Sequence, residues 1–179
     1  ERGRALVLVE PGVRTEVREV DETDGAVAHA PRRHEVALKD VRAAANAAGM
    51  RMMMWFEPER AGRDSDFMRE HPEWLLWKTA EKKGDAVVDL GNTNAWAHVC
   101  RAIDAVITGL GLSCYRQDFN IAPGPYFAFG EAPDRVGIRE IGHVTGLYRL
   151  WDALLERHPG LLIDDCAGGG RRIDLELVR

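Results

Sequence analysis

The sequence predicts an α/β fold of alternating helices and parallel strands. From residue 36 onward, stretches with a helical hydrophobic period alternate with short apolar stretches that suit buried strands. Each strand leads into polar, charged or glycine-rich residues, an arrangement typical of a (β/α)8 barrel with its site at the C-terminal strand ends. Only about three such units are visible, so we predict a partial (β/α)8 TIM barrel.

The first unit is predicted from an apolar helical stripe followed by a buried strand. Gly49 suits the C-cap of the helix, and the strand is expected over residues 50–56. The stripe is expected to face the core and consists of Leu38, Val41, Ala44, Ala45 and Ala48.

The second and third units repeat this order. In the second, Asn92 or Thr93 caps a helix that precedes a strand over 112–118. In the third, Pro159 and Gly160 stop a helix before a strand over 161–166. The predicted apolar faces are Trp96, Val99, Ile103, Val106, Ile107 and Leu110 for the second unit, and Ile141, Val144, Leu147, Trp151 and Leu154 for the third.

Two segments fall outside these units. Residues 1–35 mix short apolar runs with prolines and charges, so we separate them from a partial barrel domain over 36–179. The segment from Glu70 to Leu90 is a long excursion after the first strand, with a strand-like stretch at 87–90, and is expected to form a lid or rim.

The composition argues against several classes of function. A net charge of -5 and a pI near 5.7 argue against a nucleic-acid partner, which needs clustered Lys and Arg. No run approaches the roughly 18 to 20 apolar residues of a membrane helix, so no membrane partner is expected. The three cysteines lack CxxC spacing, which indicates reduced thiols and a cytoplasmic setting. The histidines form no HExxH or i,i+4 pair, so no metal is expected.

The end of the second strand carries the first candidate site residues. Arg116 and Asp118 point to the same face because side chains alternate along a strand. Arg116 is expected to favour the ionised form of Asp118, as a nucleophile or a stabiliser of an oxocarbenium-like transition state requires. The alternative is an ordinary buried Arg–Asp pair.

The other two strand ends also suit a sugar. Trp55 shares a face with Glu57, and an indole stacks on sugar C–H surfaces while a carboxylate accepts hydroxyl hydrogen bonds. The alternative is a core Trp with Glu57 and Glu59 paired to Arg60 and Arg63.

Cys166 opens a glycine-rich loop over 166–170, where backbone amides can approach a ligand. A phosphate cradle supported by Arg171 and Arg172, or a simple tight turn, are the alternatives. Asp174 beyond this loop could pair with Asp118, or could be a helix cap or part of an ion pair.

Taken together and in this order, the strand ends resemble glycoside hydrolase family 36, the α-galactosidase and melibiase family, over roughly residues 36–179. The resemblance rests on Trp55-Phe56-Glu57-Pro58-Glu59, on Val88-Asp89-Leu90-Gly91-Asn92, on Tyr115-Arg116-Gln117-Asp118-Phe119-Asn120 and on the run from Cys166 to Glu176. It implies that Asp118 is the nucleophile that forms the galactosyl-enzyme. The substrate-binding residues that it implies are Trp55, Lys83, Arg116, Asn120, Cys166 and Gly168.

This chain departs from the family pattern at three single positions. Arg116 stands where many members carry Lys, Gln117 replaces a common Trp, and Lys83 falls where many members have Arg. The Asp-Asp-Gly-Trp or Asp-Ala-Gly-Trp motif expected before Trp55 is absent from residues 1–54. The acid/base aspartate of the family is expected beyond Arg179, so Asp174 is not the acid by resemblance, and the isolated chain is expected to be inactive.

The function expected from the resemblance is that of a retaining α-galactosidase. It would hydrolyse terminal α-galactosyl residues of oligosaccharides such as melibiose or raffinose by double displacement, without a cofactor, and the complete enzyme would be a homo-oligomer. Two alternatives stay open, an α-N-acetylgalactosaminidase on the same scaffold and an inactive sugar-binding barrel fragment.

Overall fold

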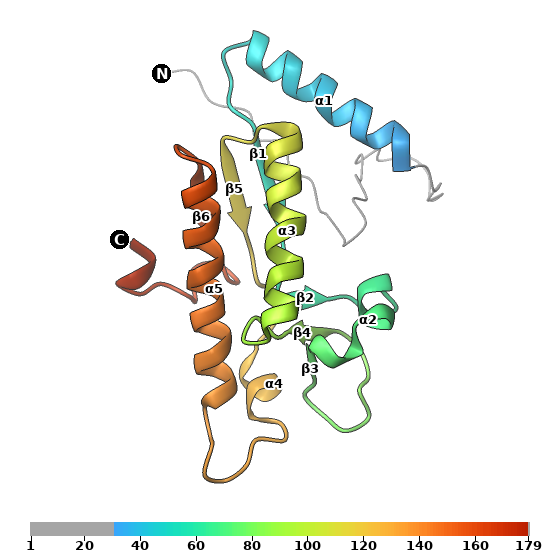
Figure 1. Cartoon of the computed structure of the whole chain (residues 1–179), viewed down its shortest axis with the longest axis vertical. Helices are drawn as coiled ribbons and strands as arrows, with labels where there is room; N and C mark the ends of the chain where they lie inside the picture. The colour runs from blue at the N-terminus through green and yellow to red at the C-terminus, as the bar shows by residue number, and fades with distance from the viewer. Residues whose placement is uncertain (1–30, 179) are drawn as a thin grey trace.

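A three-stranded parallel sheet forms the centre of the protein, in the order β1-β5-β6 (Figure 1). The computed structural model describes residues 31–178. The strands are β1 (Met53–Phe56), β5 (Cys114–Gln117) and β6 (Leu162–Asp165), and each lies within its predicted range. Two long helices, α3 (Thr93–Leu110) and α5 (Ile138–Arg157), lie side by side over one face of the sheet. The predicted α/β class with parallel strands is confirmed.

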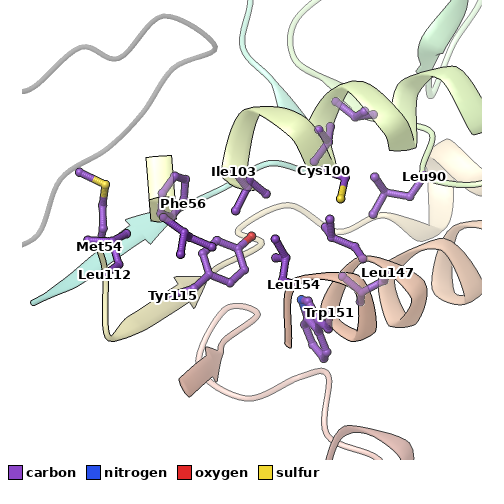
Figure 2. Close-up of a cluster of buried hydrophobic side chains, with 14 of the residues drawn as sticks. Met54, Phe56, Leu90, Cys100, Ile103, Leu112, Tyr115, Leu147, Trp151 and Leu154 are labelled. Carbon is purple, nitrogen blue, oxygen red and sulfur yellow. The ribbon is translucent and has the colours of Figure 1, made fainter. Parts of the chain in front are cut away.

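The two faces of the sheet differ in character. Along β1 and β5 every second residue is buried, so Met54, Phe56, Tyr115 and Gln117 point towards the helices. Figure 2 shows this side, where Phe56 and Tyr115 meet Ile103 of α3 and Leu154 of α5. The opposite face carries Trp55, Arg116 and Asp164, which are partners in the strand register. An indole and two charged side chains, one from each strand, therefore share the side away from the helices.

Helix α3 begins and ends where the sequence predicts. The Asn92 side chain accepts hydrogen bonds from the backbone N–H groups of Asn94 and Ala95. Gly111 ends the helix in the left-handed conformation, at φ +52°, which suits a residue without Cβ. The predicted apolar face is at least partly buried along its whole length.

The buried face of α5 confirms Leu147, Trp151 and Leu154 of the prediction and differs from it in the first half of the helix. Ile141 is 64% exposed, and the buried positions are His143, Gly146, Leu147, Leu150, Trp151 and Leu154. In its first half the buried stripe contains a histidine and a glycine, which a search for apolar residues passes over. His143 is buried because it binds the carboxylate of Glu59, which lies in the chain just after β1.

Helix α1 (Pro31–Ala47) also corrects an expectation. It begins earlier than predicted, and of its predicted stripe only Leu38 is buried, whereas Val41 is 38% exposed and Ala44 and Ala48 are exposed. The helix contacts α3, but no described element covers most of its apolar side.

The segment after the first strand, which includes the predicted excursion from Glu70 to Leu90, forms a small antiparallel sheet in the order β2-β4-β3. Its parts are β2 (Arg60–Ala61), α2 (Asp66–Glu70), η1 (Pro72–Trp74), β3 (Leu75–Leu76) and β4 (Ala86–Val88); α4 (Gly124–Ala128) and η2 (Glu176–Val178) follow later. Leu76 and Val87 pack with Phe119 and Ala167, so the β3–β4 hairpin lies beside the ends of β5 and β6. No helix within 31–178 is both long and apolar enough to cross a membrane.

Candidate active site

Asp118 occupies the point where the three parallel strands end. Its backbone N–H donates to Phe56 O of β1 at 2.8 Å, and the preceding carbonyl, Gln117 O, accepts from Cys166 N at 2.8 Å. The Gln117–Asp118 peptide is thereby held from both sides. Asp118 as a whole residue is 8% exposed, so it is sheltered yet reachable from the polar face of the sheet.

Four donors surround the Asp118 carboxylate. Trp55 Nε1 donates at 3.2 Å and Phe119 N at 2.8 Å, and the Asn120 side chain and the Cys166 thiol complete the set. Burial acts to raise the pKa of Asp118, but these hydrogen bonds outweigh it, led by that of Asn120, and the pKa lies below its usual value. Asp118 is therefore ionised, as a nucleophile must be.

Arg116 does not play the part expected of it beside Asp118. Its Nη1 donates to Asp164 Oδ2 at 2.6 Å, so its principal partner is the neighbouring strand's carboxylate. The interaction with Asp164 is the main reason why the pKa of Arg116 is raised, and Asp118 contributes less. Hydrogen bonds, rather than this cation, keep Asp118 charged.

The two glutamates in the loop after β1 have different partners. Glu57 Oε1 accepts from Asn120 N at 2.7 Å, and Oε2 pairs with Arg60, as the structural alternative predicted. Burial is the main reason why the pKa of Glu57 is raised, and the nearby Asp118 adds to it. Glu59 does not pair with Arg60 or Arg63; it is fully buried on the helix side of the sheet.

A buried polar network around Glu59 is the part of the site region that sequence reasoning missed. Glu59 accepts from Gln117, His143 and Arg172, at distances of 2.6 to 2.8 Å. Gln117 in turn accepts from Tyr115 at 2.7 Å and from Trp151 at 2.8 Å. The sequence gives one signal for this network, which is the position of Gln117. A polar residue next to the candidate nucleophile alternates to the opposite face of the strand, towards the helices.

In the glycine loop after β6, an arginine expected to support an anion cradle is bound to protein carboxylates instead. Arg172 Nη1 binds Glu59 at 2.6 Å and Nη2 binds Asp165 at 2.7 Å, so this guanidinium serves protein carboxylates. Gly168, Gly169 and Gly170 all have positive φ, which explains their type. Gly168 lies two residues after Cys166 in the sequence, and the Cys166 thiol interacts with the Asp118 carboxylate.

Two further predicted residues lie away from Asp118. Lys83 is exposed in the turn between β3 and β4, and no hydrogen bond or ion pair described within 31–178 joins it to Asp118. Asp174 accepts from Tyr148 OH at 2.5 Å and from Leu177 N at 3.0 Å, so it is a cap, as its structural alternative predicted. Trp55, Asn120 and Cys166 thus meet at Asp118, Arg116 lies beside them, and Lys83 does not join them.

The parallel strands and the polar residues at their C-terminal ends define an α/β protein with a strand-end site. The chain belongs to the melibiase family, whose model matches residues 10–179. This confirms the resemblance to glycoside hydrolase family 36.

Individual relatives agree with this assignment. The chain is 28% identical over 135 residues to α-galactosidase AgaA of Geobacillus stearothermophilus, covering 72% of this chain and 18% of the relative. It is 28% identical over 138 residues to a probable α-galactosidase C of Aspergillus flavus, covering 75% and 17%. The chain therefore spans less than a fifth of the length of these curated relatives.

Solved structures show the same fold. The α-galactosidase of Lactobacillus brevis matches with a TM-score of 0.70 and 25% identity, over 78% of this chain and 19% of that one. AgaB of Geobacillus stearothermophilus matches with a TM-score of 0.75 and 22% identity, over 97% and 24%.

Proposed function

We propose that this chain supplies the nucleophile and part of the galactose pocket of a retaining α-galactosidase. The observation that carries the proposal is the ionised Asp118 at the end of β5, bonded by Trp55, Asn120 and Cys166. These residues come from all three parallel strand ends, the place where barrel enzymes assemble their sites. We also propose that the sheet is part of a (β/α)8 barrel, because its helices cover one face and its site residues line the other.

The chemistry follows a double displacement. An Asp118 oxygen attacks the anomeric carbon, a new C–O bond forms, and the bond to the leaving oxygen breaks as an acid protonates that oxygen. Water then hydrolyses the β-galactosyl-enzyme and restores the α configuration. Asp174 is not proposed as the acid because it is bound to Tyr148 and Leu177, and Glu57 is not because both its oxygens are engaged.

The substrate class rests on the relatives. Crystal structures of variants of AgaA from Geobacillus stearothermophilus contain stachyose or raffinose, and this chain is 28% identical to AgaA over 135 residues. We therefore propose α-galactosyl oligosaccharides of this kind as substrates. The residues proposed to contact the galactose are Trp55, Lys83, Arg116, Asn120, Cys166 and Gly168; Lys83 would have to reach the sugar from the hairpin.

Covalent labelling tests the nucleophile directly. A fluorinated α-galactosyl fluoride slows hydrolysis of the galactosyl-enzyme, so the intermediate accumulates on the attacking carboxylate. After incubation of the full-length protein, we expect peptide mass spectrometry to find the sugar on Asp118. The Asp118→Asn variant, which cannot form the ester, serves as the control. A stoichiometric adduct on another carboxylate would refute the assignment.

The pH profile should depend on Asn120 more than on Arg116. Loss of the Asn120 hydrogen bond raises the pKa of Asp118, so the acidic limb of kcat/KM in Asn120→Ala should move to higher pH. Arg116→Met removes a residue bonded mainly to Asp164, and its limb should move less even if KM rises. A larger shift for Arg116→Met would show that Arg116, not hydrogen bonding, controls the ionisation of Asp118.

A further inference from the structure

Arg172 joins the three strand ends from the helix side of the sheet. It lies six residues beyond Cys166, and its two Nη atoms bind Glu59 after β1 and Asp165 at the end of β6. Its guanidinium also lies over the ring of Phe119, two residues after the end of β5, at 5.7 Å from the centroid. One side chain therefore connects all three strands that carry the site residues.

The anchors of Arg172 are themselves fixed. Glu59 is fully buried and receives further bonds from Gln117 Nε2 at 2.7 Å and from His143 Nε2 at 2.8 Å. Leu90 N–H donates to His143 Nδ1 at 3.4 Å, so the imidazole is held on both ring nitrogens. Burial alone would raise the pKa of Glu59, but the bonds from His143 and Arg172 outweigh it, so Glu59 is an anion. A buried carboxylate with this many partners is a rigid anchor.

The two sides of the sheet are connected through adjacent residues. Gln117 and Asp165 are register partners on the helix side, and each is followed by a residue of the other side, Asp118 and Cys166. Arg172 Nη2 also lies 3.4 Å from Cys166 O. Whatever fixes Asp165 and the Cys166 carbonyl therefore also fixes where the Cys166 thiol meets Asp118.

We propose that Arg172, held by Glu59 and Asp165, is a positioning residue that keeps the Cys166–Gly170 loop against Asp118. Arg172 acts through the loop and does not touch the substrate. The inference rests on the proposed role of Asp118 for its effect on catalysis. Its effect on the loop, in contrast, can be measured whatever the reaction is.

Thiol reactivity measures the position of the loop. In the full-length protein, alkylation by iodoacetamide can be followed for each cysteine by peptide mass spectrometry. In Arg172→Met we expect the alkylation rate of Cys166 to rise about tenfold as the loop opens locally. Cys114 reports on the strand, and Cys100, which is buried in the core, reports on unfolding. Both should keep their wild-type rates.

The matched control is Tyr115→Phe. The substitution removes the Tyr115 hydroxyl, which donates to Gln117 in the same buried network. Unlike Arg172, this hydroxyl is not bonded to the glycine loop. Its Cys166 should react as in the wild type. If Arg172→Met exposes Cys100, Arg172→Lys decides, because Lys keeps the charge but cannot bind Glu59 and Asp165 through a planar fork.

Kinetics supply the second measurement. A displaced loop should lower kcat about 10- to 100-fold, because small misplacements at a reacting centre are costly. The acidic limb of kcat/KM should also move to higher pH, since Asp118 loses the bond from Cys166. The charged groups near Asp118, Arg116 on β5 and Glu57 after β1, are left in place. A role in stability alone would lower the unfolding temperature without moving this limb.

The outcomes separate the two proposals. Faster alkylation of Cys166 in a protein without α-galactosidase activity would keep the positioning role and reject the proposed function. Wild-type Cys166 reactivity together with a wild-type pH profile, in folded Arg172→Met and Arg172→Lys, would overturn the positioning role even if the enzyme is active.

Discussion

Replacing Asp118 with alanine should reduce turnover of α-galactosides by about 10³-fold or more, because the covalent step loses its attacking atom. The fold should survive, since the Asp118 side chain lies on the polar face of the sheet and its bonds from Trp55 and Asn120 are local to the site. The measurement is kcat on melibiose and on an aryl α-galactoside in the full-length protein, beside the thermal unfolding temperature.

Azide distinguishes loss of a nucleophile from loss of an acid. In Asp118→Gly, azide can occupy the vacated space and attack the anomeric carbon, so an activated α-galactoside should yield β-galactosyl azide. The control is Asp164→Asn, which changes a carboxylate on the same face that is bonded to Arg116. It should keep far more activity and form no azide product. A folded Asp118→Ala retaining more than about a tenth of kcat would contradict the assignment.

The elements that the sequence predicts best are those in which local signals agree. In α3 the Asn92 cap and the apolar period that ends at Leu110 specify the same helix, and the structure follows them. The strands are located for a related reason. Short apolar runs between a helix end and charged residues leave few other positions for a parallel strand.

The positions that the sequence assigns wrongly within helices α5 and α1 depend on distant partners. Helix α5 buries His143 in place of Ile141 because Glu59, 84 residues away in sequence, needs a donor. In helix α1, Val41 is exposed. An apolar stripe predicts which residues share a helix face, but it does not show whether another element packs against that face. Hydrophobic period locates a helix better than it assigns the buried face.

Apart from Lys83, the sequence indicates which residues come together at the strand ends, but it does not indicate their bonds. Alternation along the strands places Trp55, Arg116 and Asp118 on one side, and strand order brings Cys166 next to them. The choice of Asp164 as the partner of Arg116 depends on cross-strand register, which one sequence does not reveal. The Glu59–Arg172 pair joins residues 113 apart, and no local pattern signals it.

A stability prediction tests the packing that supports the site. Gly146 of α5 lies against the backbone of Leu90, and its carbonyl accepts from Trp96 Nε1 at 2.9 Å. A Cβ at this position would lie 2.6 Å from the carbonyl carbon of Leu90 and closer still to the oxygen. Backbone atoms cannot rotate out of the way as a side chain can, so the two segments must move apart.

We therefore expect Gly146→Ala to destabilise the protein by about 1 to 3 kcal/mol, although alanine in a helix normally stabilises by up to about 1 kcal/mol relative to glycine. The matched control is Gly109→Ala in α3, where a Cβ meets nothing within 4 Å, and this variant should be neutral or stabilised by about 0.5 kcal/mol. Denaturant unfolding compares the two variants, and hydrogen exchange should show faster opening of α5 and the segment around Leu90 only in Gly146→Ala. Equal stability of the two variants would mean that α5 does not approach Leu90 this closely.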